Sequence, residues 1–260
     1  MARARGAALL LIAPLVATLL AVVVAAVILH LAGADPIRTL GDALAYGLQP
    51  TTLIAVVNKA IPYYLAGIAA AVGFHLRLFN IGIDGQYRLA AFAAAVVGAA
   101  VALPAPLHVA LVVGVAGVVG WGWAAIAGLL YVRRGVNVVI STIMLNAFAP
   151  GLIAYLLSPL RLAQQAPGSN NITTAAIPES GWIQSIALPG DAGSINGLLV
   201  IAVLVGIAYW IVLNRTTVGF EVRAMGLSAR AATVAGIRAP RLALLTMAAS
   251  GAIAGLVGLP

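Results

Sequence analysis

The stretch Ala7–Leu31 reads AALLLIAPLVATLLAVVVAAVILHL and contains no Asp, Glu, Lys or Arg. A helix needs about 20 such apolar residues to cross the hydrocarbon layer of a membrane. The apolar region of a cleaved secretory leader is shorter, typically about 7 to 15 residues. We therefore interpret Ala7–Leu31 as a first transmembrane helix that stays in the protein.

The rest of the chain repeats this pattern. Hydrophobic residues make up 63% of the 260 residues and charged residues 8%, a balance that a water-soluble domain cannot bury in one core. Further apolar runs cover residues 53–74, 86–103, 107–132, 136–157 and 197–213, and another begins near residue 242. The sequence predicts an all-α fold, a polytopic transmembrane helical bundle with about seven spans, in a single domain of residues 1–260.

Arginines mark every second connection between these runs. The connections that begin with the N-terminus contain Arg3, Arg5, Arg77, Arg133, Arg134, Arg215, Arg223, Arg230, Arg238 and Arg241. The alternate connections contain only Arg38 and Arg161. Cytoplasmic loops retain Lys and Arg during insertion, so the N-terminus is predicted to be cytoplasmic, with an outside loop at 158–196 and a cytoplasmic loop at 214–241. The net charge of +8 then reflects topology and does not indicate nucleic-acid binding.

Motifs for catalysis and cofactor binding are missing. The only lysine, Lys59, follows Asn58, so no glycine-rich phosphate loop ending in Gly-Lys is present. The sequence contains no cysteine, so a thiolate metal site is excluded. His30, His75 and His108 have no partner at metal-ligand spacing, and we expect them to lie at the membrane–water interface without a chemical role. We assign this chain no catalytic residue, no metal and no cofactor.

The segment from Leu78 to Gln86 interrupts the apolar pattern with polar residues. The apolar stretch after it, Leu89–Leu103, is about 15 residues or roughly 22 Å of helix, against a hydrocarbon core of about 30 Å. The residues just before it then lie at or near membrane depth, where polar groups mark transport pathways. The predicted pathway residues here are Asn80, Gly82, Asp84, Gly85 and Gln86. A compatible alternative is that Asp84 pairs with Arg88 or Arg77 and caps the helix.

Two further helices carry residues that favour contacts between helices. Asn137, Ser141 and Asn146 recur along one side of the span 136–157, where they either bond neighbouring helices or line a polar path. Gly114, Gly117 and Gly120 in the span 107–132 and the Gly251-x-x-x-Gly255 pair permit close approach of helix backbones.

The cytoplasmic loop 214–241 favours two short helices, near residues 220–225 and 228–234. Gly226 is expected to break them, Ser228 to cap the second and Gly236 to close it. Ala231, Ala232 and Ala235 give the second helix a narrow face that fits a groove on another protein. The alternative is a solvated loop that carries the charges needed for insertion.

Three motifs resemble the permease subunits of bacterial ABC importers for nucleosides and simple sugars, which are related more distantly to branched-chain amino-acid permeases. The first is Phe79-Asn80-Ile81-Gly82-Ile83-Asp84-Gly85-Gln86, with Asp84 in place of the more usual Glu. The second runs from Gly135 to Asn146, with Val138 where Glu is expected. The third runs from Gly219 to Ile237 and resembles the coupling loop.

The resemblance implies a transport subunit rather than an enzyme, located in the bacterial inner membrane. It implies as partners a second permease subunit, ABC ATPase subunits that hold ATP and Mg²⁺, and an extracytoplasmic solute-binding protein. The residues implied in ATPase coupling are Glu221, Arg223, Gly226, Ala231, Ala232 and Gly236. Because the family continues with further helices and the last apolar run reaches Pro260 without a polar flank, we expect this chain to be incomplete.

A second hypothesis is a secondary transporter or channel that works alone and uses Asp84 as a proton or ion site. It requires no ATPase. The two hypotheses differ in the source of energy for transport.

Overall fold

The computed structural model describes residues 2–165, 168–190 and 193–259, and only the backbone of residues 2–11. Pro260, on which the expectation of an incomplete chain rests, lies outside the described residues. The chain divides into two compact units, residues 1–56 and 57–260, which are described separately.

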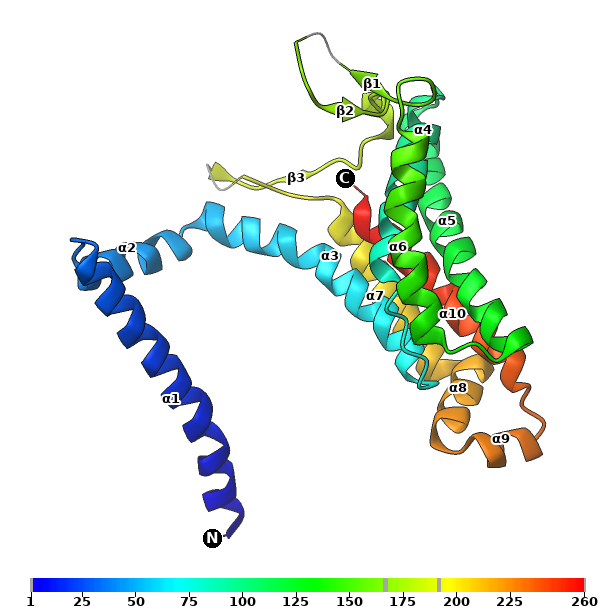
Figure 1. Cartoon of the computed structure of the whole chain (residues 1–260), viewed down its shortest axis with the longest axis horizontal. Helices are drawn as coiled ribbons and strands as arrows, with labels where there is room; N and C mark the ends of the chain where they lie inside the picture. Colours follow the sequence, from blue (N-terminus) through cyan, green and yellow to red (C-terminus); the bar gives the residue numbers. More distant parts are fainter. Residues whose placement is uncertain (1, 166–167, 191–192, 260) are drawn as a thin grey trace. The chain divides into compact units, whose positions relative to one another are not determined.

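The N-terminal unit contains two complete helices, α1 (Ala2–Leu31) and α2 (Pro36–Gly47) (Figure 1). The first confirms the predicted helix at 7–31. The second was not predicted, although its start has a clear local cause. The carboxylate of Asp35 accepts hydrogen bonds from the Ile37 and Arg38 N–H groups at 2.9 and 3.2 Å, and Pro36 occupies the first helical position.

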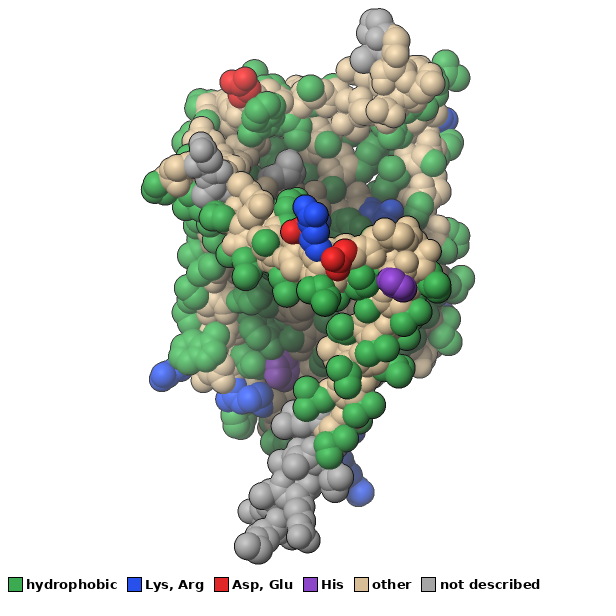
Figure 2. Space-filling model, turned by 90° about the vertical axis from the view of Figure 1, so that its left-hand side faces the viewer, with side chains coloured by type: hydrophobic (Ala, Val, Ile, Leu, Met, Phe, Trp, Pro, Cys, Tyr) green, Lys and Arg blue, Asp and Glu red, His purple; other side chains and the backbone are tan. Residues whose placement is uncertain are grey.

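The other predicted spans are confirmed as helices. They are α3 (Pro50–Phe74), α4 (Ile83–Ala99), α5 (Ala105–Arg134), α6 (Val138–Leu156), α7 (Leu198–Arg215) and α10 (Ala239–Gly255), which ends in the 3-10 turn η3 (Leu256–Gly258). Among the described residues, six helices are long and apolar enough to cross a membrane, and the 17-residue α4 is not one of them. Hydrophobic side chains cover most of the visible surface in Figure 2, as expected where lipid is the solvent.

Small residues bring α5 and α10 into backbone contact. A Cβ atom on Gly120 would overlap the Gly251 carbonyl oxygen, and one on Gly255 would overlap the Ala116 carbonyl oxygen. This confirms the predicted close approach at Gly120, Gly251 and Gly255. The prediction was wrong for Gly114, where a Cβ would meet no atom within 4 Å, and for Gly117, where it would only touch the Ala252 carbonyl oxygen at 4.0 Å. Helices without bulky side chains between them gain dispersion contacts along their whole interface, which drives association in lipid.

Two hairpins and a 3-10 turn form the segment between α6 and α7. Strand β1 (Gln164–Gln165) pairs with β2 (Ile172–Thr173), and β3 (Ile186–Ala187) pairs with β4 (Ser194–Ile195), both antiparallel. The turn η1 (Glu179–Gly181) immediately precedes Trp182.

This outer segment is tied to the helices at two points. The Asn58 side chain of α3 donates to the Ser194 carbonyl and accepts from the Asn196 N–H, both at 2.9 Å. His108 of α5 bonds the Ser180 hydroxyl at 2.8 Å and the Gly98 carbonyl at 2.9 Å, and its side chain is fully buried. His108 thus lies near the start of its helix, and both of its ring nitrogens have partners inside the fold.

At the other end of the bundle, which is the side predicted to be cytoplasmic, lie two short helices, α8 (Thr217–Leu227) and α9 (Ala229–Val234). The expected break at Gly226 was wrong. Gly226 is helical, and the break falls at Ser228, whose extended backbone and side-chain bond to the Ala231 N–H confirm it as the N-cap of α9. Gly236 closes the pair with a φ of +89°, as predicted.

Candidate functional site

Asn80, Gln86 and Ser250 form a buried polar cluster among α3, α4 and α10. The Asn80 amide donates to Gln86 Oε1 at 3.0 Å and to Ser250 Oγ at 2.8 Å, while Gln86 Nε2 donates to Asn80 Oδ1 at 3.0 Å. Ser250 Oγ in turn donates to the Ala69 carbonyl of α3 at 2.6 Å. All three side chains are buried, so these bonds replace water that is excluded from the bundle.

Asn146 of α6 holds the first turn of α4. Its side-chain oxygen accepts from the Gly85 N–H at 2.8 Å and its amide donates to the Ile81 carbonyl at 2.7 Å. Gly85 allows this approach, because a Cβ there would lie only 2.9 Å from Asn146 Oδ1. One side chain thus satisfies the Gly85 N–H, which the start of a helix would otherwise leave open, and the Ile81 carbonyl just before the helix.

These bonds show where α4 begins. Ser250 lies eleven residues beyond Ala239, the first residue of α10, and Asn146 lies eight residues beyond Val138, the first residue of α6. At 1.5 Å per residue these positions are roughly 16 and 12 Å from the first residues of their helices. The chain therefore leaves α3 at the end of the bundle where α6 and α10 begin, and returns into the bundle before α4 starts, which explains why α4 is short.

Asp84 stands at this level on the first turn of α4. It pairs with Arg88 at 2.9 Å, and the two side chains are 48% and 50% exposed in this chain. Of the two partners expected for Asp84, the structure selects Arg88. Ionisable groups in a membrane bundle face its interior or a water-filled space rather than lipid, so this face of α4 is the candidate wall of a polar path.

The predicted pathway residues do not all meet here. Asn80, Gly82, Asp84, Gly85, Gln86 and Asn146 surround the first turn of α4. The other two lie nearer the start of α6, where the Asn137 side chain accepts from the Val139 N–H at 2.8 Å and the Ser141 hydroxyl donates to the Asn137 carbonyl at 2.9 Å. Ser250 was missed, because a single serine in an apolar run gives no signal without its partner.

The pair α8–α9 packs against the end of α7 and the start of α10. Val222, Ala232, Ile237 and Leu242 form its core. The predicted docking face on α9 needs a correction, since Ala232 is only 4% exposed and is used within this chain. Leu227 and Val234 are instead 86% exposed, and they were overlooked among the arginines. They are the most exposed large apolar side chains of α8–α9, ahead of Phe220 at 62%.

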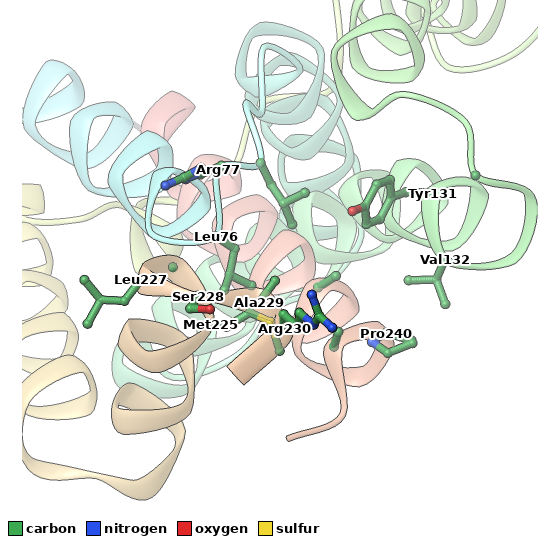
Figure 3. A pocket seen from close by; sticks show the side chains of 15 residues that line it. Leu76, Arg77, Tyr131, Val132, Met225, Leu227, Ser228, Ala229, Arg230 and Pro240 are labelled. Atoms are coloured by element: carbon green, nitrogen blue, oxygen red, sulfur yellow. The ribbon is translucent and has the colours of Figure 1, made fainter. Parts of the chain in front are cut away.

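The other predicted coupling residues have mixed positions. Arg223 donates to the Leu213 carbonyl of α7, Glu221 is half-buried, and Ala231 is exposed. Gly226 contacts the His75 carbonyl so closely that a Cβ would overlap it. Beside it opens a cavity of about 710 Å³ (Figure 3), bounded by the end of α5, α8–α9, the start of α10 and the residues after α3.

The family model for the permease component of branched-chain amino acid transport systems matches residues 52–259, which include every element of this site. The chain belongs to this permease family. Its apolar helices make the permease a multi-pass membrane protein, which in a bacterium resides in the inner membrane.

Curated relatives of the permease are ABC transporter subunits. A guanosine ABC transporter permease of Bacillus subtilis is 34% identical over 202 residues, covering 78% of this chain and 57% of the relative. A glucose ABC transporter permease of Haloferax volcanii is 32% identical over 254 residues, covering 95% and 66%. A nucleoside ABC transporter permease of Lactococcus lactis is 31% identical over 256 residues, covering 94% and 68%.

These matches confirm the resemblance to nucleoside and sugar permeases. The chain spans roughly three fifths to two thirds of the length of these relatives. No solved structure matches the permease. The roles of its individual residues therefore have to be argued from its own geometry.

Proposed function

We propose that this chain is the membrane-spanning permease subunit of an ABC importer that moves nucleosides or related simple sugars into the cell. The observation that carries the proposal is the start of α4 inside the helical bundle, with the half-exposed Asp84–Arg88 pair on its first two turns. The substrates for which the relatives are named, guanosine, nucleosides and glucose, are small and rich in hydroxyl groups. Such solutes exchange hydrogen bonds with water for bonds to charged and amide groups along a polar path.

Within this proposal the polar residues divide into two roles. The side chains of Asp84 and Arg88 and the exposed part of Asn146 face the path. Asn80 and Gln86 fix the backbone beneath them, because they are buried and bonded to each other. Preorganised supports of this kind hold polar groups where a solute passes without reorganisation at each cycle.

The proposed importer requires partner subunits in addition to this chain. Two ABC ATPase subunits would bind ATP and Mg²⁺ and dock at α8–α9 through Leu227 and Val234. A second permease subunit would complete the path along the exposed face of α4, and an extracytoplasmic solute-binding protein would deliver the solute to the outer segment. The importer then works by shifting a two-state equilibrium between outward and inward access.

A secondary transporter that uses Asp84 as an ion site is less well supported. The Arg88 guanidinium, 2.9 Å away, already occupies the carboxylate that would have to bind the ion. An incoming cation would therefore compete with a fixed positive charge.

Uptake by cells tests the substrate class. The full-length gene and its partner genes would be placed in a strain that takes up neither nucleosides nor the tested sugars, and uptake of radiolabelled guanosine, adenosine, uridine, glucose and ribose would be measured. The proposal expects uptake of at least one of these solutes. Absence of uptake for the whole panel, with the complex present in the membrane, would contradict it.

A further inference from the structure

Residues 75–82, here termed the α3–α4 connection, contact α8 at one end and lead to the first turn of α4 at the other. At its lower end, the His75 carbonyl touches Gly226 of α8. At its upper end, Asn80 belongs to the buried polar cluster beneath Asp84. The same eight residues thus contact both the cytoplasmic helices and the beginning of α4.

The lower half of the connection is packed into α8–α9. Leu76 lies against the cluster of Val222, Ala232, Ile237 and Leu242, and also against a second cluster that contains Leu78 and Leu145. Figure 3 shows Leu76 and Arg77 on one side of the 710 Å³ cavity, with Met225, Leu227 and Ser228 from the cytoplasmic helices close by. A displacement of α8–α9 would therefore press on the connection, and the cavity leaves room for such a displacement.

The turn after α3 makes the connection compact. The Leu78 N–H bonds the Gly73 carbonyl at 3.0 Å and the Arg77 N–H bonds the Phe74 carbonyl at 2.9 Å, the two bonds of a Schellman motif. Arg77 adopts the left-handed backbone at φ +57°, a position usually taken by glycine. Since this turn is closed by its own hydrogen bonds, it moves as one piece rather than stretching.

The upper half is bonded to the residues that fix α4. The Gly82 N–H donates to Asn80 Oδ1 at 3.0 Å, and the Ile81 carbonyl accepts from Asn146 at 2.7 Å. Displacement of Asn80 or Ile81 would therefore change the hydrogen bonds that position the first turn of α4, where Asp84 and Arg88 lie.

We infer that the α3–α4 connection transmits movement of α8–α9 to the start of α4, so that Leu76, Leu78 and Asn80 are positioning residues for opening and closing the path. The inference rests on the proposed function, since it needs an ATPase that moves α8–α9. A competing route runs along α10, whose first residues line the same cavity and whose Ser250 bonds Asn80.

Site-specific labelling separates these routes, and the absence of cysteine from this sequence makes it convenient. Two reporters are needed, Val218→Cys on α8 and Ile81→Cys at the upper end of the connection, because both side chains are exposed. Any cysteine outside this sequence would be replaced first. The full-length permease would be assembled with its ATPases in nanodiscs, and the rate of reaction with a water-soluble maleimide measured with and without ATP and vanadate.

Leu78→Ala is the test variant and Leu145→Ala its matched control. Both leucines belong to the same cluster and are 7% and 9% exposed, but only Leu78 lies in the connection. In the parent we expect ATP to change the labelling rate several-fold at both reporters. Leu78→Ala should keep the response at residue 218 and lose it at residue 81, whereas Leu145→Ala should keep both.

Two results would overturn the inference: an ATP response at residue 81 that survives Leu78→Ala, or one that Leu145→Ala removes equally. If Leu78→Ala does not fold, Gly226→Ala takes its place as the test variant, because the added Cβ would overlap the His75 carbonyl. Gly122→Ala is then the control, since a Cβ at that position would meet no other atom. Failure of any ATPase to assemble with the parent would instead refute the proposed function. The two failures are thus distinguishable.

Discussion

Asn80 and Gln86 exchange two side-chain hydrogen bonds, each 3.0 Å long, across the beginning of α4. The pair is buried, and Ser250 links it to the α3 backbone. A reciprocal amide pair satisfies polar groups that would be costly to leave alone in a dry interior. The segment that interrupts the apolar pattern is therefore a fixed structural element and not a loose turn.

Replacing Gln86 by methionine tests the stability of this element. The side chain keeps its approximate volume but loses both hydrogen bonds with Asn80, whose amide keeps Ser250 and whose oxygen keeps the Gly82 N–H. Two lost hydrogen bonds at about 0.5–1.5 kcal/mol each should cost about 1–3 kcal/mol. Thermal unfolding of the purified protein in detergent should show a lower midpoint. Gln184→Met, on an exposed glutamine of the outer segment, should leave the midpoint unchanged. Equal midpoints for Gln86→Met and the parent would show that the pair contributes nothing.

Gly120→Leu should separate α5 from α10. A side chain there has to displace the Gly251 carbonyl, so we expect a loss of several kcal/mol and poor recovery of folded protein. Gly122→Leu, two residues away on the same helix, meets open space and serves as the control. Size-exclusion profiles in detergent would compare the two. A monodisperse Gly120→Leu variant with parental stability would refute the close packing.

Asp84→Asn should affect transport more than stability. Ion pairs with half-exposed side chains contribute at most about 1 kcal/mol, so the unfolding midpoint should change little. Uptake should fall at least several-fold, because Arg88 loses its counter-ion on the wall of the path. The exposed Arg38–Asp42 pair, with the same spacing, provides the control variant Asp42→Asn. Parental uptake by Asp84→Asn would place the pair outside the path.

Leu227→Asp and Val234→Asp should weaken ATPase association. Both side chains are 86% exposed, so the fold does not need them, whereas an apolar docking site would be lost on introduction of a charge. Co-purification of a tagged ATPase should fall by at least tenfold. Leu160→Asp, on a residue that is 96% exposed in the outer segment, should have no effect. Unchanged co-purification for both variants would show that the ATPase does not dock at Leu227 and Val234.

The helices were predictable because apolar runs, which give the spans, depend on local composition. The assignment of sides from the arginines stays a prediction. The cap at Ser228 and the closing Gly236 also followed from local rules. Glycines 120, 251 and 255 were recognised for the same reason.

The depth of α4 and the roles of its polar residues needed the tertiary structure. The sequence placed Asn80 and Gln86 near the membrane, but their closed cluster depends on Ser250, 170 residues from Asn80. Ala232 seemed free for a partner because small residues look alike whether they face solvent or a neighbouring helix. Helix α2 was missed because its apolar content is low and its start depends on the cap formed by Asp35.

ATP-driven uptake by the reconstituted complex tests the central claim most directly. Proteoliposomes would contain the full-length permease and its ATPases, with ATP inside, the solute-binding protein outside and no ion gradient. The account predicts accumulation of labelled nucleoside or sugar that stops when ATP is replaced by a non-hydrolysable analogue. Uptake by the permease alone, driven by a proton or sodium gradient and indifferent to ATP, would contradict it.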